Sequence, residues 1–360
     1  MAKIILHIGT EKTGTTAIQE CIHANRDLLL SQLGIFVPFA YSRYQNHRCF
    51  MEIVPTLNVP QDDLYNELAE SVGASFDARS QRDSWLRSFE NDAEEFSDKC
   101  FLLSSEHFHS RLDTQDSIVK FLQFLSAYFS EIRVVIFLRD PFYCAAALRS
   151  TLVVNGHCVP DPLEPENERV RLLCDHATSL QRWSSSLQLA GFDPSSLEPH
   201  LYAPEEFPHR CAARNFLRLL GVENPDQFKF PTRKVNESLG PRELELLNHF
   251  NRLTPSAGEH INISEILSLL SRIKSETRSS VQRSAAQDPA LMARFDAFYR
   301  ASNEWVHHHF FSGRPVLFEA APSESRAKLD LSDEVFHSLS TFQTRSRILG
   351  RLRELTDNYS

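Results

Sequence analysis

The sequence lacks a long apolar run and has little glycine. Its 360 residues include 11 Gly and 18 Pro, and 42% of them are hydrophobic, which excludes collagen-like, low-complexity and wholly disordered chains. A membrane span needs about 18 consecutive apolar residues, whereas the N-terminal run covers only residues 4–8 before Glu11 and Lys12 follow. We therefore expect no transmembrane segment, no signal peptide and a cytoplasmic location.

Positive charge is also scarce. The 38 Lys and Arg residues are outnumbered by 47 Asp and Glu residues, which gives a formal net charge of −9. This balance argues against a nucleic-acid partner held by bulk charge. An anionic ligand must therefore meet a local group of cations.

The cysteines and histidines follow no metal-binding pattern. The seven cysteines are odd in number, scattered and never spaced C-x-x-C, so we predict reduced thiols, no disulfide framework and no zinc site. His307, His308 and His309 are adjacent, but three consecutive helical residues point in different directions and form a poor chelate. We therefore predict no metal site.

Short apolar segments alternate with helical patterns over the first 200 residues. Apolar segments cover residues 3–8, 35–39, 100–104 and 133–138, and residues 197–202 are predicted as the last strand. Helical spacing covers residues 15–25, 62–71, 81–96, 115–128, 141–154 and 169–189. Strands that alternate with helices predict an α/β fold, in which helices flank both faces of a parallel sheet in three layers.

The length predicts one large domain with extensions, or two domains. We expect an α/β core at residues 1–240 with insertions near 41–97 and 155–168, a helical extension at 241–321 that completes the core, and a helical tail at 322–360. The insertion at 155–168 holds three prolines and four carboxylates and is either a lid or an exposed loop. In the tail we predict one amphipathic helix at 332–355, whose apolar face packs on the core or on a second subunit in a homodimer.

A glycine-containing loop joins the first strand to the first helix. It reads Gly9-Thr10-Glu11-Lys12-Thr13-Gly14-Thr15-Thr16, and its glycine spacing matches a P-loop, in which backbone N–H groups and a helix N-terminus hold an anion. The ATP-type pattern places lysine directly after the second glycine, whereas here Lys12 precedes Gly14 by two residues. Spacing alone leaves nucleotide binding and a tight structural turn both open.

Together with later motifs, this loop resembles the sulfotransferases that use 3′-phosphoadenosine 5′-phosphosulfate (PAPS). The segment 12–16 looks like their 5′-phosphosulfate loop. Segments similar to bacterial sulfotransferase-like proteins are found at residues 104–106, 137–141, 182–183, 236–239 and 302–305. The resemblance covers about residues 3–311. It implies a P-loop-type fold with PAPS as sulfuryl donor, 3′-phosphoadenosine 5′-phosphate (PAP) as product, and no metal.

The resemblance also implies how the donor is held. Lys12 would neutralise the leaving oxygen of a loose, in-line transfer, and Arg139 would take the 3′-phosphate. The groups that would hold the 5′-phosphate belong to Thr13, Gly14, Thr15 and Thr16.

The chain departs from the family pattern on the helix that follows Arg139. The family usually has a serine eight residues after that arginine, and this sequence has Ala147. We expect Ser150 to substitute for it, with Arg149 as another candidate. Arg233 and Lys234 would supply further positive charge to the 3′-phosphate.

Transfer to a hydroxyl or amine also needs a general base. Glu106 and His107 follow the strand at 100–104, and His47 follows the strand at 35–39. All three residues come after strand ends, where open α/β sheets bind ligands. Glu106 is the first choice, but each of the three could instead be a hydrogen-bonded structural group.

The resemblance implies a bacterial-type sulfotransferase that modifies a sugar, a lipid-linked saccharide or a small metabolite. The acidic chain favours neutral or cationic acceptors, because like charges repel. Two alternatives remain. One is a P-loop kinase or nucleotide hydrolase in which Asp140 holds Mg²⁺. The other is a catalytically silent nucleotide-binding or partner-docking protein, which Ala147 keeps open.

Overall fold

A computed structural model describes residues 2–38, 46–54, 57, 77–160, 163–230, 239–253, 265–270, 289–318 and 333–358. The chain forms two compact units. The first consists of Met1–Asp140, Arg171–Val235 and Arg300–Phe318, and the second of Pro141–Val170, Asn236–Tyr299 and Glu319–Ser360. Both units are assembled from separated stretches of sequence, whereas the predicted boundaries at 240 and 321 divide the chain into consecutive blocks.

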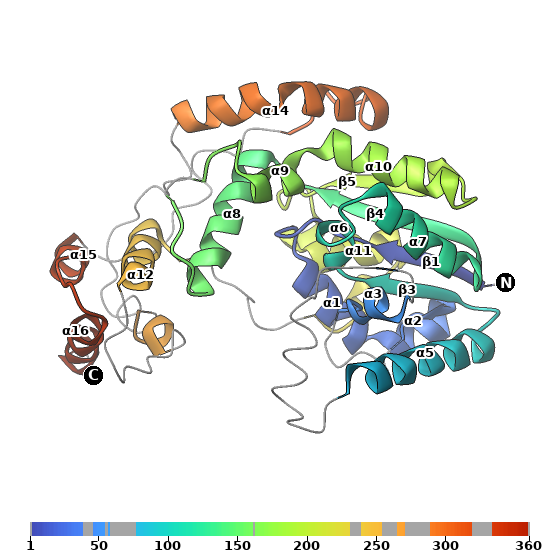
Figure 1. Cartoon of the computed structure of the whole chain (residues 1–360), viewed down its shortest axis with the longest axis horizontal. Helices are drawn as coiled ribbons and strands as arrows, with labels where there is room; N and C mark the ends of the chain where they lie inside the picture. Colours follow the sequence, from blue (N-terminus) through green and yellow to red (C-terminus); the bar gives the residue numbers. More distant parts are fainter. Residues whose placement is uncertain are drawn as a thin grey trace. The chain divides into compact units, whose positions relative to one another are not determined.

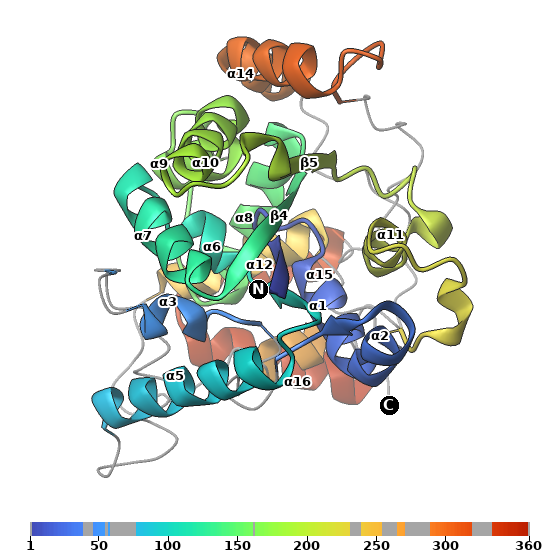
Figure 2. The ribbon, with the colours of Figure 1, turned by 90° about the vertical axis from the view of Figure 1, so that its right-hand side faces the viewer.

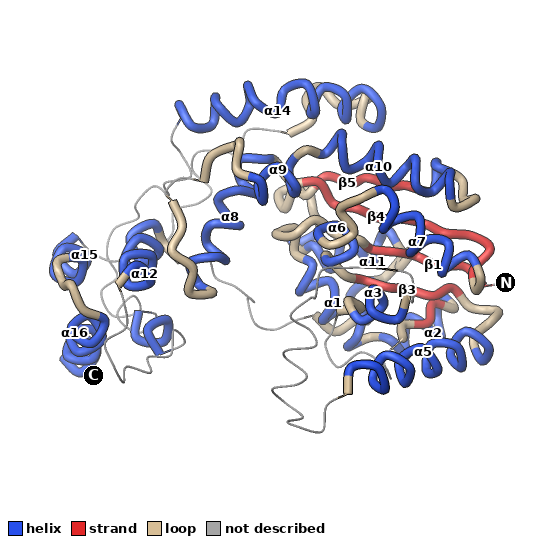
Figure 3. The backbone as a smooth tube through the Cα atoms, in the orientation of Figure 1, coloured by secondary structure: helices blue, strands red, loops and turns tan. Residues whose placement is uncertain are grey.

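A five-stranded parallel sheet forms the centre of the first unit (Figure 1). Its strands are β1 (Ala2–His7), β2 (Ile35–Phe36), β3 (Cys100–Ser104), β4 (Phe129–Leu138) and β5 (Leu197–Leu201). They lie in the order β2-β3-β1-β4-β5, and each neighbouring pair is parallel. Figure 3 shows them side by side in red. The predicted parallel α/β sheet is confirmed.

Helices cover both faces of this sheet because the strands are apolar on both sides. Ile4 and Leu6 of β1 belong to one apolar cluster and Ile5 to another, since successive strand residues point to opposite faces. The first cluster includes the buried faces of α5 (Ala78–Glu95), α7 (Gln115–Ser126) and α10 (His176–Leu189). The second includes those of α1 (Thr15–Ala24), α2 (Arg26–Leu33) and α11 (Ala212–Leu219). Figure 2 shows α7 and α10 on one side of the sheet and α2 and α11 on the other.

The remaining elements of the first unit are short. They are α3 (Cys49–Ile53), α6 (His107–Ser110) and the 3-10 turns η1 (Pro194–Ser196), η2 (Pro208–Arg210) and η3 (Pro225–Gln227). Two helices, α9 (Glu168–Cys174) and α14 (Pro289–Phe310), contribute residues to both units.

The order of the strands determines where a ligand site is expected. The chain leaves β1 toward α1, on the face of the second cluster, and leaves β3 toward α7, on the face of the first. Adjacent parallel strands whose connections leave to opposite faces open a crevice at their carboxyl ends, where α/β proteins bind ligands. The loop after β1 lies at this point.

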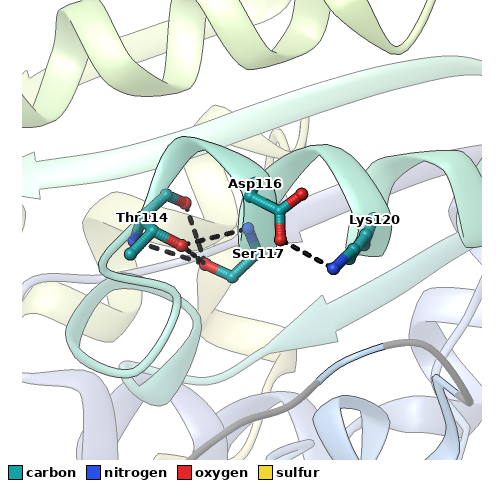
Figure 4. Close-up of polar contacts among 4 residues, drawn as sticks. All are labelled: Thr114, Asp116, Ser117 and Lys120. Atoms are coloured by element: carbon teal, nitrogen blue, oxygen red, sulfur yellow. Dashed lines mark hydrogen bonds and ion pairs between the residues drawn. The ribbon is translucent and has the colours of Figure 1, made fainter.

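Local side-chain contacts determine where α7 begins (Figure 4). The Thr114 hydroxyl accepts a hydrogen bond from the Ser117 backbone N–H at 3.1 Å, and the Thr114 N–H donates to the Ser117 hydroxyl at 3.3 Å. One turn later, Lys120 forms an ion pair with Asp116 at 2.7 Å. This reciprocal cap satisfies backbone donors that have no partner within the helix.

Two predicted helices are each divided in two. The segment predicted as one helix at 169–189 forms α9 and α10, because the Asp175 side chain accepts the Thr178 N–H and starts a new helix. The helix predicted at 332–355 forms α15 (Asp333–Ser340) and α16 (Arg345–Asn358). The prediction of single helices was wrong here, because periodicity detects neither the cap at Asp175 nor the non-helical residues 341–344. The helix predicted at 62–71 lies outside the described residues.

The second unit is helical. It contains α8 (Pro141–Val154), α12 (Pro241–Arg252), the helical residues 265–270, α15 and α16. Leu339, Ile348 and Leu352 are fully buried in a cluster with Leu247 and Phe250 of α12. The apolar faces of the two C-terminal helices are therefore covered within their own unit.

Candidate active site

The loop between β1 and α1 needs its glycines. Gly9 and Gly14 have φ angles of 41° and 78°, in the left-handed region. A Cβ atom on Gly9 would lie 2.6 Å from Thr15 Cγ2, and one on Gly14 would lie 2.9 Å from the Ala212 Cβ. Both positions therefore exclude larger side chains.

Three hydrogen bonds fix the path of this loop. The Thr10 hydroxyl donates to the Phe137 carbonyl of β4 at 2.8 Å, and the Thr13 hydroxyl donates to the Thr10 carbonyl at 2.6 Å. Arg139 Nη1 donates to the Lys12 carbonyl at 2.6 Å. Lys12 itself is left-handed, with a φ of 71°. The loop is thus held by the end of β4, and the Thr13 hydroxyl is used inside the loop.

Arg139 lies between the loop and Tyr202. Its guanidinium carbon is 5.4 Å from the centre of the Tyr202 ring, and its carbonyl accepts a hydrogen bond from His176 Nε2 at 2.8 Å. The Tyr202 ring also lies beneath the loop, 3.4 Å from where a Gly14 Cβ would stand. Sequence reasoning missed Tyr202, although it directly follows β5 at the carboxyl edge of the sheet.

The start of α1 has the properties of an anion site. Gly14 occupies the N-cap position without a side-chain hydrogen bond, and the first turn contains no acidic residue, so backbone N–H groups are left for a ligand. Within the described part of the chain, no ion pair or hydrogen bond engages the Lys12 ammonium. Fixed N–H donors beside the cations Lys12 and Arg139 fit a phosphate-bearing ligand.

Glu106 lies against α1. Its Oε2 accepts a hydrogen bond from Gln19 Nε2 at 2.7 Å, and it precedes α6 immediately after β3. Gln19 comes one turn after Thr15, about 6 Å further along the helix axis. The structure therefore brings Glu106 to the same helix whose N-terminus is the candidate anion site.

The other two candidate bases lie in different surroundings. The His47 ring is fully buried, its Nδ1 accepts from the Ser104 N–H at 3.0 Å, and its Nε2 lies 3.0 Å from the Pro38 carbonyl. Both ring nitrogens are therefore occupied in the neutral imidazole. Burial lowers the pKa of His47 to about 3, and His23 adds to this effect. His47 thus supports the end of β3, and we do not retain it as a base. His107 is half-buried at the start of α6 and remains an alternative.

The groups predicted to assist Arg139 are not all placed. Arg233 and Lys234 lie outside the described residues. Ser150 and Arg149 belong to α8 of the second unit, as does Ala147. Ser150 is half-buried, and Arg149 Nε donates to the Pro160 carbonyl at 3.1 Å. Their roles toward a 3′-phosphate stay predictions.

A fully buried histidine that sequence reasoning missed lies under the loop. His7 ends β1, and its Nδ1 is 2.8 Å from the Ser104 hydroxyl. Its Nε2 has no hydrogen-bond partner among the described residues and would lie 3.6 Å from a Cβ on Gly9. The signal that could have found it is its position, two residues before Gly9.

We predict that the protein loses stability as the pH falls from 7 to 5. Burial lowers the pKa of His7, His47 and His109 to about 3 and that of His176 to about 4, whereas the unfolded value is about 6.5. Below pH 6.5 the unfolded state therefore binds more protons, and each histidine costs on the order of 2 kcal/mol of unfolding free energy by pH 5. Urea unfolding at a series of pH values measures this.

The control for this experiment removes one of the histidines. His109→Gln keeps a polar group beside Ser179, which lies 2.8 Å from His109 Nε2, and should reduce the slope of stability against pH. Asp92 acts in the opposite direction, because burial raises its pKa to about 6. A flat profile between pH 5 and pH 7 would contradict the prediction.

Two members of the histidine triplet bond to backbone carbonyls of the same region. His307 Nε2 bonds to the Arg314 carbonyl at 2.8 Å and His309 Nδ1 to the Trp305 carbonyl at 2.7 Å. In the described residues, no three His, Cys, Asp or Glu side chains gather in a group that could hold a metal ion. No helix in the described stretches is long and apolar enough to span a membrane.

Comparisons with known proteins give only distant likeness. The sequence matches no family model, and no curated protein matches it at a significant level. The structure is similar to a sulfotransferase from Alicyclobacillus acidocaldarius, with 14% identity, a TM-score of 0.40, and coverage of 84% of this chain and 94% of the other. It is also similar to the sulfotransferase domain from the curacin biosynthetic pathway, with 13% identity, a TM-score of 0.29, and coverage of 62% and 74%. Likeness this distant assigns no activity, so function must be inferred from the site.

Proposed function

We propose that the protein is a sulfotransferase that moves a sulfuryl group from PAPS to a hydroxyl or amine. The observation that carries this proposal is the contact between Arg139 and the Lys12 carbonyl across 127 residues. It joins two of the motifs that resemble the sulfotransferases, at residues 12–16 and 137–141, at one edge of the sheet. The uncapped start of α1 lies at the same place and suits the 5′-phosphate of the donor.

The reaction needs only positioning, charge neutralisation and one proton acceptor. The acceptor oxygen or nitrogen attacks sulfur, a bond to sulfur forms, and the bond from sulfur to the bridging oxygen of the donor breaks. The electron pair stays on the phosphate of PAP, where the Lys12 ammonium stabilises the charge. The proton of the acceptor passes to the Glu106 carboxylate. No step in this sequence calls for a metal ion.

The acceptor class follows from charge and from the family resemblance. We propose a neutral or cationic sugar, lipid-linked saccharide or small metabolite, because a chain with a net charge of −9 repels a highly sulfated acceptor. We also propose a cytoplasmic enzyme. A homodimer would have to use surfaces other than the covered apolar faces of α15 and α16.

The test is direct transfer from a labelled donor. The purified protein is incubated with ³⁵S-labelled PAPS and a panel of sugars, alcohols and amines, with EDTA present. We expect labelled product and PAP in equal amounts. ATP turnover that EDTA abolishes would instead indicate a P-loop kinase or hydrolase. Binding of PAP without transfer or donor hydrolysis would indicate a silent nucleotide-binding protein.

A further inference from the structure

We propose that Gln19 is a positioning residue that holds the Glu106 carboxylate by one oxygen and leaves the other oxygen to take the proton of the acceptor. This inference rests on the proposed function. Its observation is the 2.7 Å hydrogen bond between Gln19 Nε2 and Glu106 Oε2, which joins residues 87 apart in the sequence.

Gln19 is a polar residue at a buried position, so its side chain needs a hydrogen-bond partner. It is only 4% exposed and lies on α1 next to Ile18, which is fully buried in the second apolar cluster. A buried amide without a partner destabilises a protein by a few kcal/mol, so an apolar residue would serve packing better. In the described part of the chain, the hydrogen bond of the Gln19 side chain goes to Glu106.

The chemistry of the pair suits a base that must remain reactive. An ionised carboxylate only accepts hydrogen bonds, so the amide nitrogen of Gln19 must face it. A neutral donor orients the carboxylate and leaves its charge in place, whereas a lysine or arginine would neutralise that charge. The second carboxylate oxygen then keeps its lone pairs for the acceptor.

The contact also connects the base to the donor site. Gln19 and the N–H groups that would hold the 5′-phosphate belong to one helix, α1. Side chains of a helix lean toward its N-terminus, which brings the Gln19 amide toward the loop. The backbone before Glu106 is fixed as well, because the Ser105 N–H donates to the His7 carbonyl at 3.0 Å. The distance between base and donor is therefore determined by one rigid group of elements.

The variants that test this role change the hydrogen bond but not the size of the side chain. Gln19→Met keeps the length and removes the donor. Gln19→Glu keeps the shape and places a second carboxylate beside Glu106. The matched control is Gln32→Met, because the Gln32 amide also bonds a side chain, Gln227 at 3.2 Å, but lies exposed on α2.

The readouts separate positioning from packing. Release of ³⁵S-sulfate from PAPS to water gives kcat without a known acceptor, and calorimetry gives the affinity for PAP. For Gln19→Met we expect kcat to fall about 10- to 100-fold, with the KM for PAPS and the Kd for PAP within about twofold. For Gln19→Glu we expect a larger loss at pH 8 and partial recovery toward pH 6.5, since two adjacent carboxylates then begin to share a proton.

A measurement without turnover checks the contact itself. The side-chain amide signal of Gln19 in an NMR spectrum is identified by its loss in Gln19→Met. It should shift in Glu106→Leu and stay unchanged in His107→Gln. An unmoved signal in Glu106→Leu would overturn the contact in solution.

The outcomes are distinguishable. If the wild-type protein transfers or hydrolyses the donor and Gln19→Met is no slower than Gln32→Met, the role of Gln19 is overturned and the proposed function stands. If Gln19→Met is slow at every pH and Gln19→Glu behaves identically, Gln19 serves packing only, and the role is again overturned. If the wild-type protein neither transfers nor hydrolyses PAPS while the NMR contact is present, the proposed function is overturned, and so is the proposed role of Gln19 in it.

Discussion

Lys12→Met should lower the rate of sulfuryl transfer about 1000-fold while the protein stays folded. Removal of one preorganised group that stabilises transition-state charge typically costs 10²- to 10³-fold, and here the group lost carries a full positive charge. The loop should survive, because Arg139 bonds the carbonyl of residue 12 and the hydroxyls of Thr10 and Thr13 make the other two contacts. Methionine, like lysine, is unbranched at Cβ, so residue 12 should keep its left-handed conformation in the variant.

Single-turnover transfer from labelled PAPS measures this loss, and circular dichroism checks the fold. The control is Lys120→Met, which removes a surface lysine whose partner is Asp116 at 2.7 Å and should leave the rate unchanged. Lys12→Arg keeps the charge but alters its shape and should recover only part of the rate. Full activity of Lys12→Met would end the proposed role of this residue.

Glu106→Gln is expected to lower kcat by 10²- to 10⁴-fold, the range that a positioned general base contributes. The amide has the volume of the carboxylate and can still accept the hydrogen bond from Gln19, but it cannot take a proton. Because the hydrogen bond that the described residues give the Glu106 side chain goes to Gln19 and not to the loop that would hold the donor, we expect the Kd for PAP to change less than about threefold. Donor hydrolysis and PAP calorimetry measure the two quantities.

The same assay compares the three residues from which the base was to be chosen. We expect His107→Gln to keep most of the rate. We expect His47→Gln to lower the free energy of unfolding, because it removes hydrogen bonds to Ser104 and Pro38, with little effect on kcat in the folded fraction. A normal rate in Glu106→Gln together with a large loss in His107→Gln would transfer the role to His107.

The centre of the sheet could be predicted from the sequence because most residues of β1, β3 and β4 are buried on both faces. The apolar run at 100–104 matches β3 closely, and the last strand predicted at 197–202 matches β5. It was also predictable that Arg139 and the loop would lie near each other, since the carboxyl ends of parallel strands meet at one edge of the sheet. The predicted contact partner was the donor, however, and the Lys12 carbonyl was not foreseen.

Other parts of the site depend on contacts that leave no local pattern. Gln19 reads as an ordinary polar helix residue until Glu106, 87 residues away, is found beside it. Tyr202 reads as the end of a strand, although its ring supports both Arg139 and Gly14. His47 was considered as a base because it follows a strand. Its burial and its two hydrogen bonds, which the sequence does not reveal, favour a structural role. Burial and long-range pairing are properties of the assembled sheet.

The left-handed conformation of Lys12 has a consequence for how the chain folds during synthesis. A non-glycine residue in that conformation costs on the order of 1 kcal/mol. The Lys12 carbonyl accepts its hydrogen bond from Arg139, which follows β4, and β4 lies beside β1 on the side opposite β3. A nascent chain that has emerged only as far as β3 therefore lacks the group that holds its own anion loop. PAP should accordingly protect β1, β3 and β4 together against hydrogen exchange, and a fragment that ends before β4 should not bind it.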